Sequence, residues 1–179
     1  FDPVNPDDAD ESESFFIGLD YFTSSMEEKN ESGDVIASAF ITLPKLVALP
    51  VTEENTGIGA GWEVEDVNKI VEAFNVQLAE DLEGMEQPFG EVAEQAHNIY
   101  ETEGGAEFLA AEPLFYNVRI ESVFVTEGGF LSVLSVAEKN MGGAAPVEES
   151  YVWNFDMNNG YFVTDLADGI ADDADQMKN

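Results

Sequence analysis

The chain has 179 residues, 44% of them hydrophobic, which is enough apolar material to build a buried core. It contains no cysteine and one histidine, so disulfides, thiolate metal sites and a cysteine nucleophile are excluded. Its 38 acidic residues outnumber six basic ones, giving a formal net charge of -32. Such a surface repels nucleic acid and anionic lipid and attracts basic partners, although solubility alone would also account for the charge.

Both ends of the chain are acidic. Residues 1–13 contain two prolines and few apolar side chains, which predicts a disordered linker, and residues 171–179 form an acidic tail. Between them we expect one domain, residues 14–170, made of a strand pair and helices (14–112) followed by C-terminal hairpins (113–170). No apolar run reaches the roughly 18 residues that span a membrane, and the chain does not begin with Met. We therefore expect no membrane insertion in this segment, and a signal peptide or anchor that has been removed.

The first strands are indicated by alternation of apolar and polar residues. Residues 15–23 and 35–43 both follow this pattern, with a polar stretch between them, and predict a hairpin. Residues 44–61 contain two prolines and three glycines, which is typical of a connection.

Helical spacing follows. Apolar residues recur at steps of three and four from Asp66 to Met85 and predict an amphipathic helix of about five turns. Because proline disrupts a helix interior, Pro88 is expected to end it, and a shorter second helix is expected to reach Tyr100. Residues 103–107, EGGAE, then predict a break.

Period-two alternation returns after Pro113. It predicts one hairpin that turns at Gly128 and Gly129, and a second that turns at residues 158–160. The whole pattern predicts an α+β fold: an antiparallel sheet built from hairpins, with one long amphipathic helix and a shorter second helix packed on it.

No motif for catalysis or for a cofactor is present. The single imidazole, His97, has no nucleophile-elbow pattern beside it and is interpreted as structural. Asp156, Asn158 and Gly160 resemble the start of a calcium loop, but glycine stands where an oxygen ligand belongs, so a turn is predicted. With 38 acids, pairs of neighbouring carboxylates arise by chance. No catalytic residue, metal site or cofactor is therefore predicted.

Residues 128–170, GGFLSVLSVAEKNMGGAAPVEESYVWNFDMNNGYFVTDLADGI, resemble the extracellular domain of the RsiV anti-sigma factor family, which is shared with the noncatalytic N-terminal region of PdaC-type peptidoglycan deacetylases. The family has a G-x-x-S-V strand, a GGAHP-like loop and an FDL-x-x-G hairpin. Their counterparts are Gly129 to Val133, Gly142 to Pro146, and Phe155 to Gly160. The family's loop histidine falls on Ala145, so that imidazole is absent here.

The resemblance implies a noncatalytic domain, secreted or on the bacterial cell surface. In the RsiV type this domain binds lysozyme by filling its active-site cleft, as receptor and inhibitor. Lysozyme of the animal type is strongly basic, and the acidic chain would attract it. The expected partner-binding residues are Gly142, Gly143, Ala145, Pro146, Glu148, Glu149 and Tyr151.

Two alternatives remain open at this point. One is a carboxylate-dependent hydrolase of cell-wall glycan, which needs two facing acids in a cleft. The other is a glycan-binding accessory or sensory domain that binds peptidoglycan. It would be favoured if aromatic residues such as Trp62 or Trp153 line an open groove.

Overall fold

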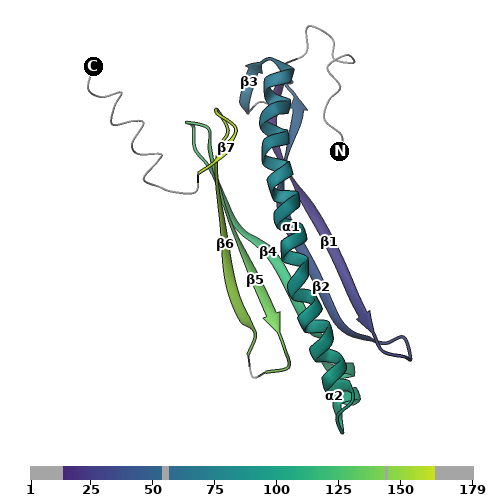
Figure 1. Ribbon diagram of the computed structural model, residues 1–179. Coiled ribbons are helices and arrows are strands. Elements are labelled where there is room, and N and C mark those ends of the chain that lie inside the picture. Colours follow the sequence, from purple (N-terminus) through teal and green to yellow (C-terminus); the bar gives the residue numbers. More distant parts are fainter. Residues whose placement is uncertain (1–13, 54–56, 144, 164–179) are drawn as a thin grey trace, which may run out of the picture.

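The computed structural model describes residues 14–53, 57–143 and 145–163, and in them the chain folds into one sheet and two helices (Figure 1). The elements are β1 (Phe15–Lys29), β2 (Val35–Pro50), β3 (Ile58–Trp62), α1 (Val64–Tyr100), α2 (Gly105–Ala111), β4 (Leu114–Val125), β5 (Phe130–Asn140), β6 (Val147–Asp156) and β7 (Tyr161–Phe162). The predicted α+β class is confirmed. The predicted linker, residues 1–13, and tail, residues 171–179, lie outside the described residues.

The seven-stranded sheet has the order β3-β1-β2-β4-β5-β6-β7. All its pairs are antiparallel except β2 with β4, where Ala37 to Ile41 run parallel to Leu114 to Val118. The prediction of a wholly antiparallel sheet is wrong at this pair. Between β2 and β4 the chain passes along the length of α1, and a long crossover of this kind returns the chain in its original direction.

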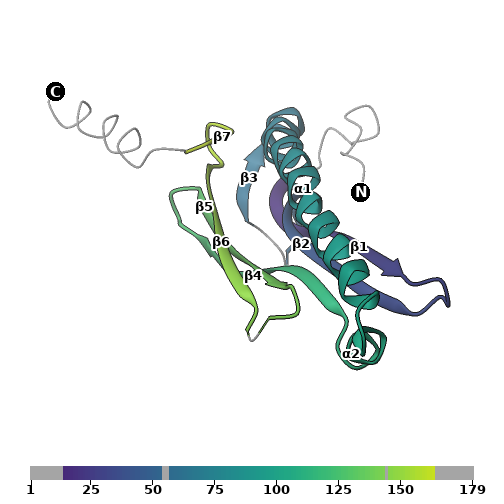
Figure 2. The same cartoon turned by 60° about the horizontal axis from the view of Figure 1, so that its bottom comes forward.

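The sheet consists of two wings joined by this short parallel ladder. We call β3, β1 and β2 the first wing, and β4 to β7 the second wing. Beyond Ile41 and Val118 the wings diverge, and α1 lies across the first wing on the side that faces the second (Figures 1 and 2). The other face of the sheet carries exposed Phe40, Phe124 and Val152.

The first hairpin is longer than the alternation predicts. β1 continues to Lys29 through polar residues, and β2 continues through Pro44 to Pro50, so residues 44–50 are strand rather than connection. Pro44 is tolerated because of the direction of its backbone. The N–H and C=O of Leu46 bond the side chain of Asn75 at 2.9 and 2.8 Å, so even-numbered residues of this stretch point away from β1. The N–H that Pro44 lacks would have pointed out of the hairpin too.

The long helix does not end at Pro88. It runs for 37 residues, about 55 Å, from Val64 to Tyr100, and the second helix lies at Gly105–Ala111 rather than before Tyr100. A proline in a helix interior costs about 3 kcal/mol. Burial on both sides of it outweighs this cost, since Met85, Phe89, Val92 and Ala96 continue the apolar stripe. Neither described helix has the length and apolarity to cross a membrane.

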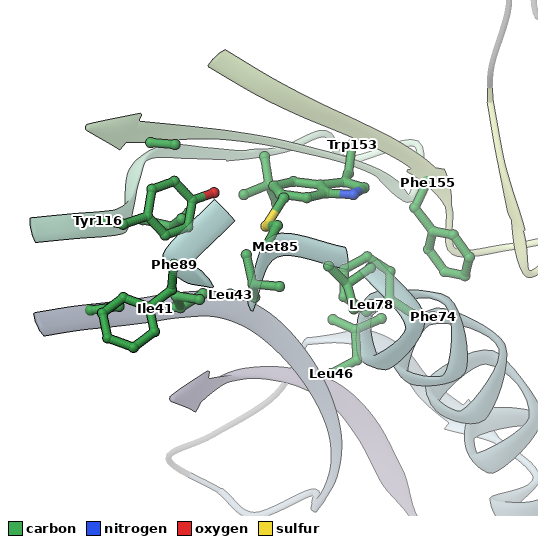
Figure 3. Packing of buried hydrophobic residues seen from close by; sticks show 14 of the residues in the cluster. Ile41, Leu43, Leu46, Phe74, Leu78, Met85, Phe89, Tyr116, Trp153 and Phe155 are labelled. Carbon is green, nitrogen blue, oxygen red and sulfur yellow. The ribbon is translucent and has the colours of Figure 1, made fainter. Parts of the chain in front are cut away.

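The core lies between α1 and the inner faces of both wings (Figure 3). Phe74 of α1 packs on the second wing at one end: its ring is 5.1 Å from that of Phe155 and 5.3 Å from that of Phe162. Farther along, Met85 lies between Leu43 of the first wing and Trp153 of the second (Figure 3). The wings are therefore held together by side chains of the helix, and only at five residue pairs by backbone hydrogen bonding.

Candidate partner-binding site

The predicted site loop joins β5 to β6, and the last pair of the hairpin is Lys139 with Val147. Gly142 fixes the loop to the body: its φ is +81°, and a Cβ there would lie 2.9 Å from Ile99 at the end of α1. Asn140 accepts a hydrogen bond from the Gly142 N–H at 2.9 Å. Gly142 is therefore needed for the turn itself. Beyond it, Gly143 has open space around its Cα.

Most of the remaining site residues are exposed. Gly143, Ala145, Pro146, Glu148 and Glu149 are exposed, and Tyr151 is half-buried. Because strand side chains alternate, Glu148 lies on the outer face of the second wing, opposite Glu138 of β5. Glu149 and Tyr151 lie on the inner face, toward α1. The structure thus keeps all seven residues on one hairpin but divides them between its tip and its two faces.

A groove runs between β6 and the middle of α1, and the sequence pattern gave no sign of it. One hollow of about 360 Å³ is lined by Glu80, Asp81, Gly84, Met85, Tyr151, Val152 and Trp153. Nearer the hairpin tip, a second hollow of about 180 Å³ is lined by Pro88, Glu91, Tyr116, Ala137, Lys139, Val147 and Glu149. The sequence did not predict the α1 residues of this groove, because they are far from β6 in the chain and only the tertiary fold brings the second wing beside them.

Trp153 anchors β6 across the groove. Its indole N–H donates a 2.8 Å hydrogen bond to Asp81 of α1, and the indole stacks with Tyr151 at 6.2 Å between ring centres. Asp81 also accepts a hydrogen bond from Gln77 at 3.2 Å. The carboxylate of Asp81 is thus held in place by two donors, as expected of a structural acid.

Two tyrosines, Tyr116 and Tyr151, line the two hollows of the groove. Tyr116 is 2% exposed, and its hydroxyl makes no hydrogen bond of normal geometry, although it interacts with the hydroxyl of Tyr151. Burial, followed by the neighbouring Tyr151 and Glu149, raises the pKa of Tyr116 well above its ordinary value. Burial likewise raises the pKa of Tyr151, which donates a 3.2 Å hydrogen bond to Glu149. At neutral pH both phenols are therefore neutral hydrogen-bonding groups and not bases or nucleophiles.

A third hollow, of about 410 Å³, lies at the opposite end of α1. It is lined by Trp62, Asp66, Lys69, Ile70, Asn158, Asn159 and Gly160. Asn158 and Asn159 belong to the β6–β7 turn, where both of their backbone N–H groups bond the carboxylate of Asp156. That carboxylate stabilises the predicted turn. The lining combines an aromatic ring, two side-chain amides and the Asp66–Lys69 ion pair.

His97 is half-exposed on α1, with its Nε2 2.8 Å from Oε1 of Glu28 on β1. Within residues 14–53, 57–143 and 145–163, no three side chains of the metal-binding types are grouped so as to hold an ion.

No family model matches this chain, and no curated protein does. Among solved structures it is similar to a DUF3298 family protein of Bacteroides fragilis, with 10% identity and a TM-score of 0.45 over 82% of this chain. It is also similar to a DUF3298 family protein of Pseudomonas aeruginosa, with 14% identity and a TM-score of 0.38 over 89% of this chain. The chain spans 58% and 57% of their lengths. At these values the likeness by itself assigns no family or function.

Proposed function

We propose that this chain is a noncatalytic binding module of the bacterial cell envelope, secreted or surface-exposed, that recognises a basic protein. The observation that carries the proposal is the β5–β6 hairpin. Gly142, where its loop begins, lies close against Ile99 at the end of α1, and Glu148 and Glu149 on the strand after the loop are exposed and acidic. A binding loop that is held in place loses little conformational entropy when a partner arrives.

A lysozyme-type muramidase is the first candidate partner. The resemblance to the RsiV family supports it, and so does the charge, because a chain of net charge -32 increases the encounter rate with a strongly basic protein. Charge mainly sets the on-rate, so shape at the hairpin tip would have to supply specificity. Ala145 is exposed where the family has histidine, and contact at that position would be made without an imidazole.

Calorimetric titration with an animal-type lysozyme tests this proposal, at about 0.15 M and about 0.5 M salt, with an unrelated basic protein as control. Screening removes attraction between exposed charges but leaves shape complementarity. Binding that persists at the higher salt concentration and spares the control protein is the expected result. Binding that disappears with salt, or equal binding of both proteins, would contradict the proposal.

Variants locate the contact. Pro146→Ala and Tyr151→Ala are expected to weaken binding while the fold survives. Phe124→Ala, at the opposite end of the second wing, is the matched control because Phe124 is 66% exposed and pairs with Ser132, far along β5 from the loop. Unchanged affinity in both hairpin variants would remove this loop from the site.

A glycan-binding module is the second candidate function. Trp62 and Trp153 both line open hollows, which is the feature expected of such a domain. The Trp62 hollow favours it more, since its amides could bond sugar hydroxyls and its indole could stack on a pyranose ring. Titration with soluble peptidoglycan fragments, with Trp62→Ala as the variant, distinguishes the two candidates. Release of products during that titration would instead favour the hydrolase alternative.

A further inference from the structure

The backbone of β6 has a defined direction at its outer edge. The Met157 N–H bonds the Gly129 carbonyl at 2.8 Å, so odd-numbered residues face β5, while the Asn154 carbonyl accepts from the Val163 N–H at 2.8 Å on the other side. Since successive backbone groups alternate in a strand, the even-numbered residues before Asn154 also face outward. The N–H and C=O groups of Glu148, Ser150 and Val152 therefore point away from β5.

No described strand pairs with this edge. β7 is the only described neighbour of β6 beyond β5, and it pairs only with Phe155 and Asp156. Glu148, Ser150 and Val152 are all exposed, Val152 at 59%. In the part of the chain that the structure describes, three consecutive outward positions thus offer free backbone donors and acceptors. An open strand edge is a template for a further strand.

The groove lies directly inside this edge. An added strand would direct alternate side chains toward the 360 Å³ hollow, whose walls are Met85 and the Tyr151–Trp153 stack, with Glu80 at its rim. The hollow therefore suits an apolar side chain every second residue, and the rim suits a positive charge. Backbone pairing would supply affinity, and the hollow would supply selectivity.

Charge selects the occupant. Glu148 and Glu149 are adjacent on the edge strand, and Glu80 of α1 lines the hollow beside Tyr151 and Trp153. Lys139, the one base that lines either hollow, is already bonded to Glu91 at 3.2 Å. Two copies paired along this edge would bring four glutamates together on two adjacent strands that carry no base, which opposes pairing of the chain with itself.

We propose that the outer edge of β6 at Glu148, Ser150 and Val152 accepts an extended, positively charged segment of the partner protein as an added strand. The inference rests on the proposed function for the class of partner and deepens it by stating the mode of binding. It differs from contact at the hairpin tip alone, since it requires the outward N–H groups of the strand.

The first experiment uses the full chain and a synthetic heptapeptide of alternating lysine and valine. Backbone amide NMR in about 0.15 M salt is expected to show shift changes and slower hydrogen exchange at Glu148, Ser150 and Val152. The same peptide N-methylated at every residue keeps its charge but cannot pair, and should leave these amides unchanged. Equal effects of both peptides would overturn the proposal. Amides that already exchange slowly without peptide would overturn it too, because the edge would then be occupied by this chain or a second copy.

The second experiment titrates lysozyme into two variants. Ser150→Pro removes an outward N–H, which an edge strand tolerates, while Ser150→Val keeps the N–H and favours strand. Affinity should fall about tenfold or more in the proline variant and stay within about twofold in the valine variant, with a denaturation midpoint showing that both are folded. Lysozyme binding that is unaffected by Ser150→Pro would refute the added strand but leave the proposed function. Peptide pairing without lysozyme binding would refute the partner but leave the edge site.

Discussion

Each wing has a stretch of strand edge that no described strand pairs with, and the two edges differ in what satisfies their backbone groups. On β2, past Ile41, the side chain of Asn75 bonds both backbone groups of Leu46 and so replaces a neighbouring strand. On β6, before Asn154, no strand or side chain of the described residues bonds the outward backbone groups of Ser150 or Val152. Buried backbone groups need a hydrogen-bond partner within the protein, whereas exposed ones can bond water until a partner strand replaces it. The edge of β2 is therefore closed by Asn75, and the edge of β6 can accept a strand.

The largest expected effect comes from removing the aromatic contact between α1 and the second wing. Phe74→Ala deletes a fully buried ring that packs on Phe155 and Phe162, and should lower the free energy of unfolding by about 3–5 kcal/mol. Denaturant unfolding measures this. Val76→Ala is the control on the same helix, where a 54% exposed side chain should matter by less than about 0.5 kcal/mol. Similar losses of unfolding free energy in both variants would contradict the packing of Phe74 against Phe155 and Phe162.

Removal of the Asn75 side chain, which bonds the edge of β2, should have the next largest effect. Asn75→Ala leaves the Leu46 N–H and C=O without their partner and is expected to cost about 1–3 kcal/mol. Hydrogen exchange should speed up at the Leu46 amide specifically. Glu72→Ala, exposed on the same helix, is the control. An unchanged exchange rate at Leu46 would mean that Asn75 does not protect this edge.

Pro88→Ala should stabilise the chain. It restores the helix N–H that proline lacks and should raise the free energy of unfolding by about 1–2 kcal/mol, less than the full cost of a helix proline because the surroundings have adapted. Thermal unfolding of this variant, compared with Gln87→Ala, measures the gain. A loss of stability would show that the pyrrolidine ring is required where it lines the hollow beside β6.

The smallest expected effect is a dependence on alkaline pH. The pKa of Tyr116 is raised from an ordinary value of 10.0, so the folded state holds its proton more tightly than the unfolded state. The stability from this difference is complete below pH 10 and is lost above it, by at most about 1.4 kcal/mol per pH unit. Between pH 8 and pH 11 the free energy of unfolding should therefore decline less steeply in Tyr116→Phe than in the unchanged chain. Identical pH profiles would place that hydroxyl in a water-like environment.

Local pattern determined much of this molecule from the sequence alone. Period-two alternation located the hairpins, and three- and four-residue spacing located the start of the long helix, because burial of one face requires those periods. The turn at residues 158–160 followed from its Asn-Asn-Gly composition. The loop from Gly142 to Pro146 was also predicted, as a connection between two hairpins, whereas the pairing of β5 with β6 across it comes from the structure.

The tertiary structure decided the features that depend on distant partners. Pro88 remains inside α1 because both wings bury the helix on either side of it, and Pro44 remains inside β2 because its missing N–H would have pointed out of the hairpin. The parallel pair and the groove beside β6 likewise arise from segments far apart in the chain. Pairing and burial between distant segments contribute free energies that exceed local preferences, so no local pattern could reveal them.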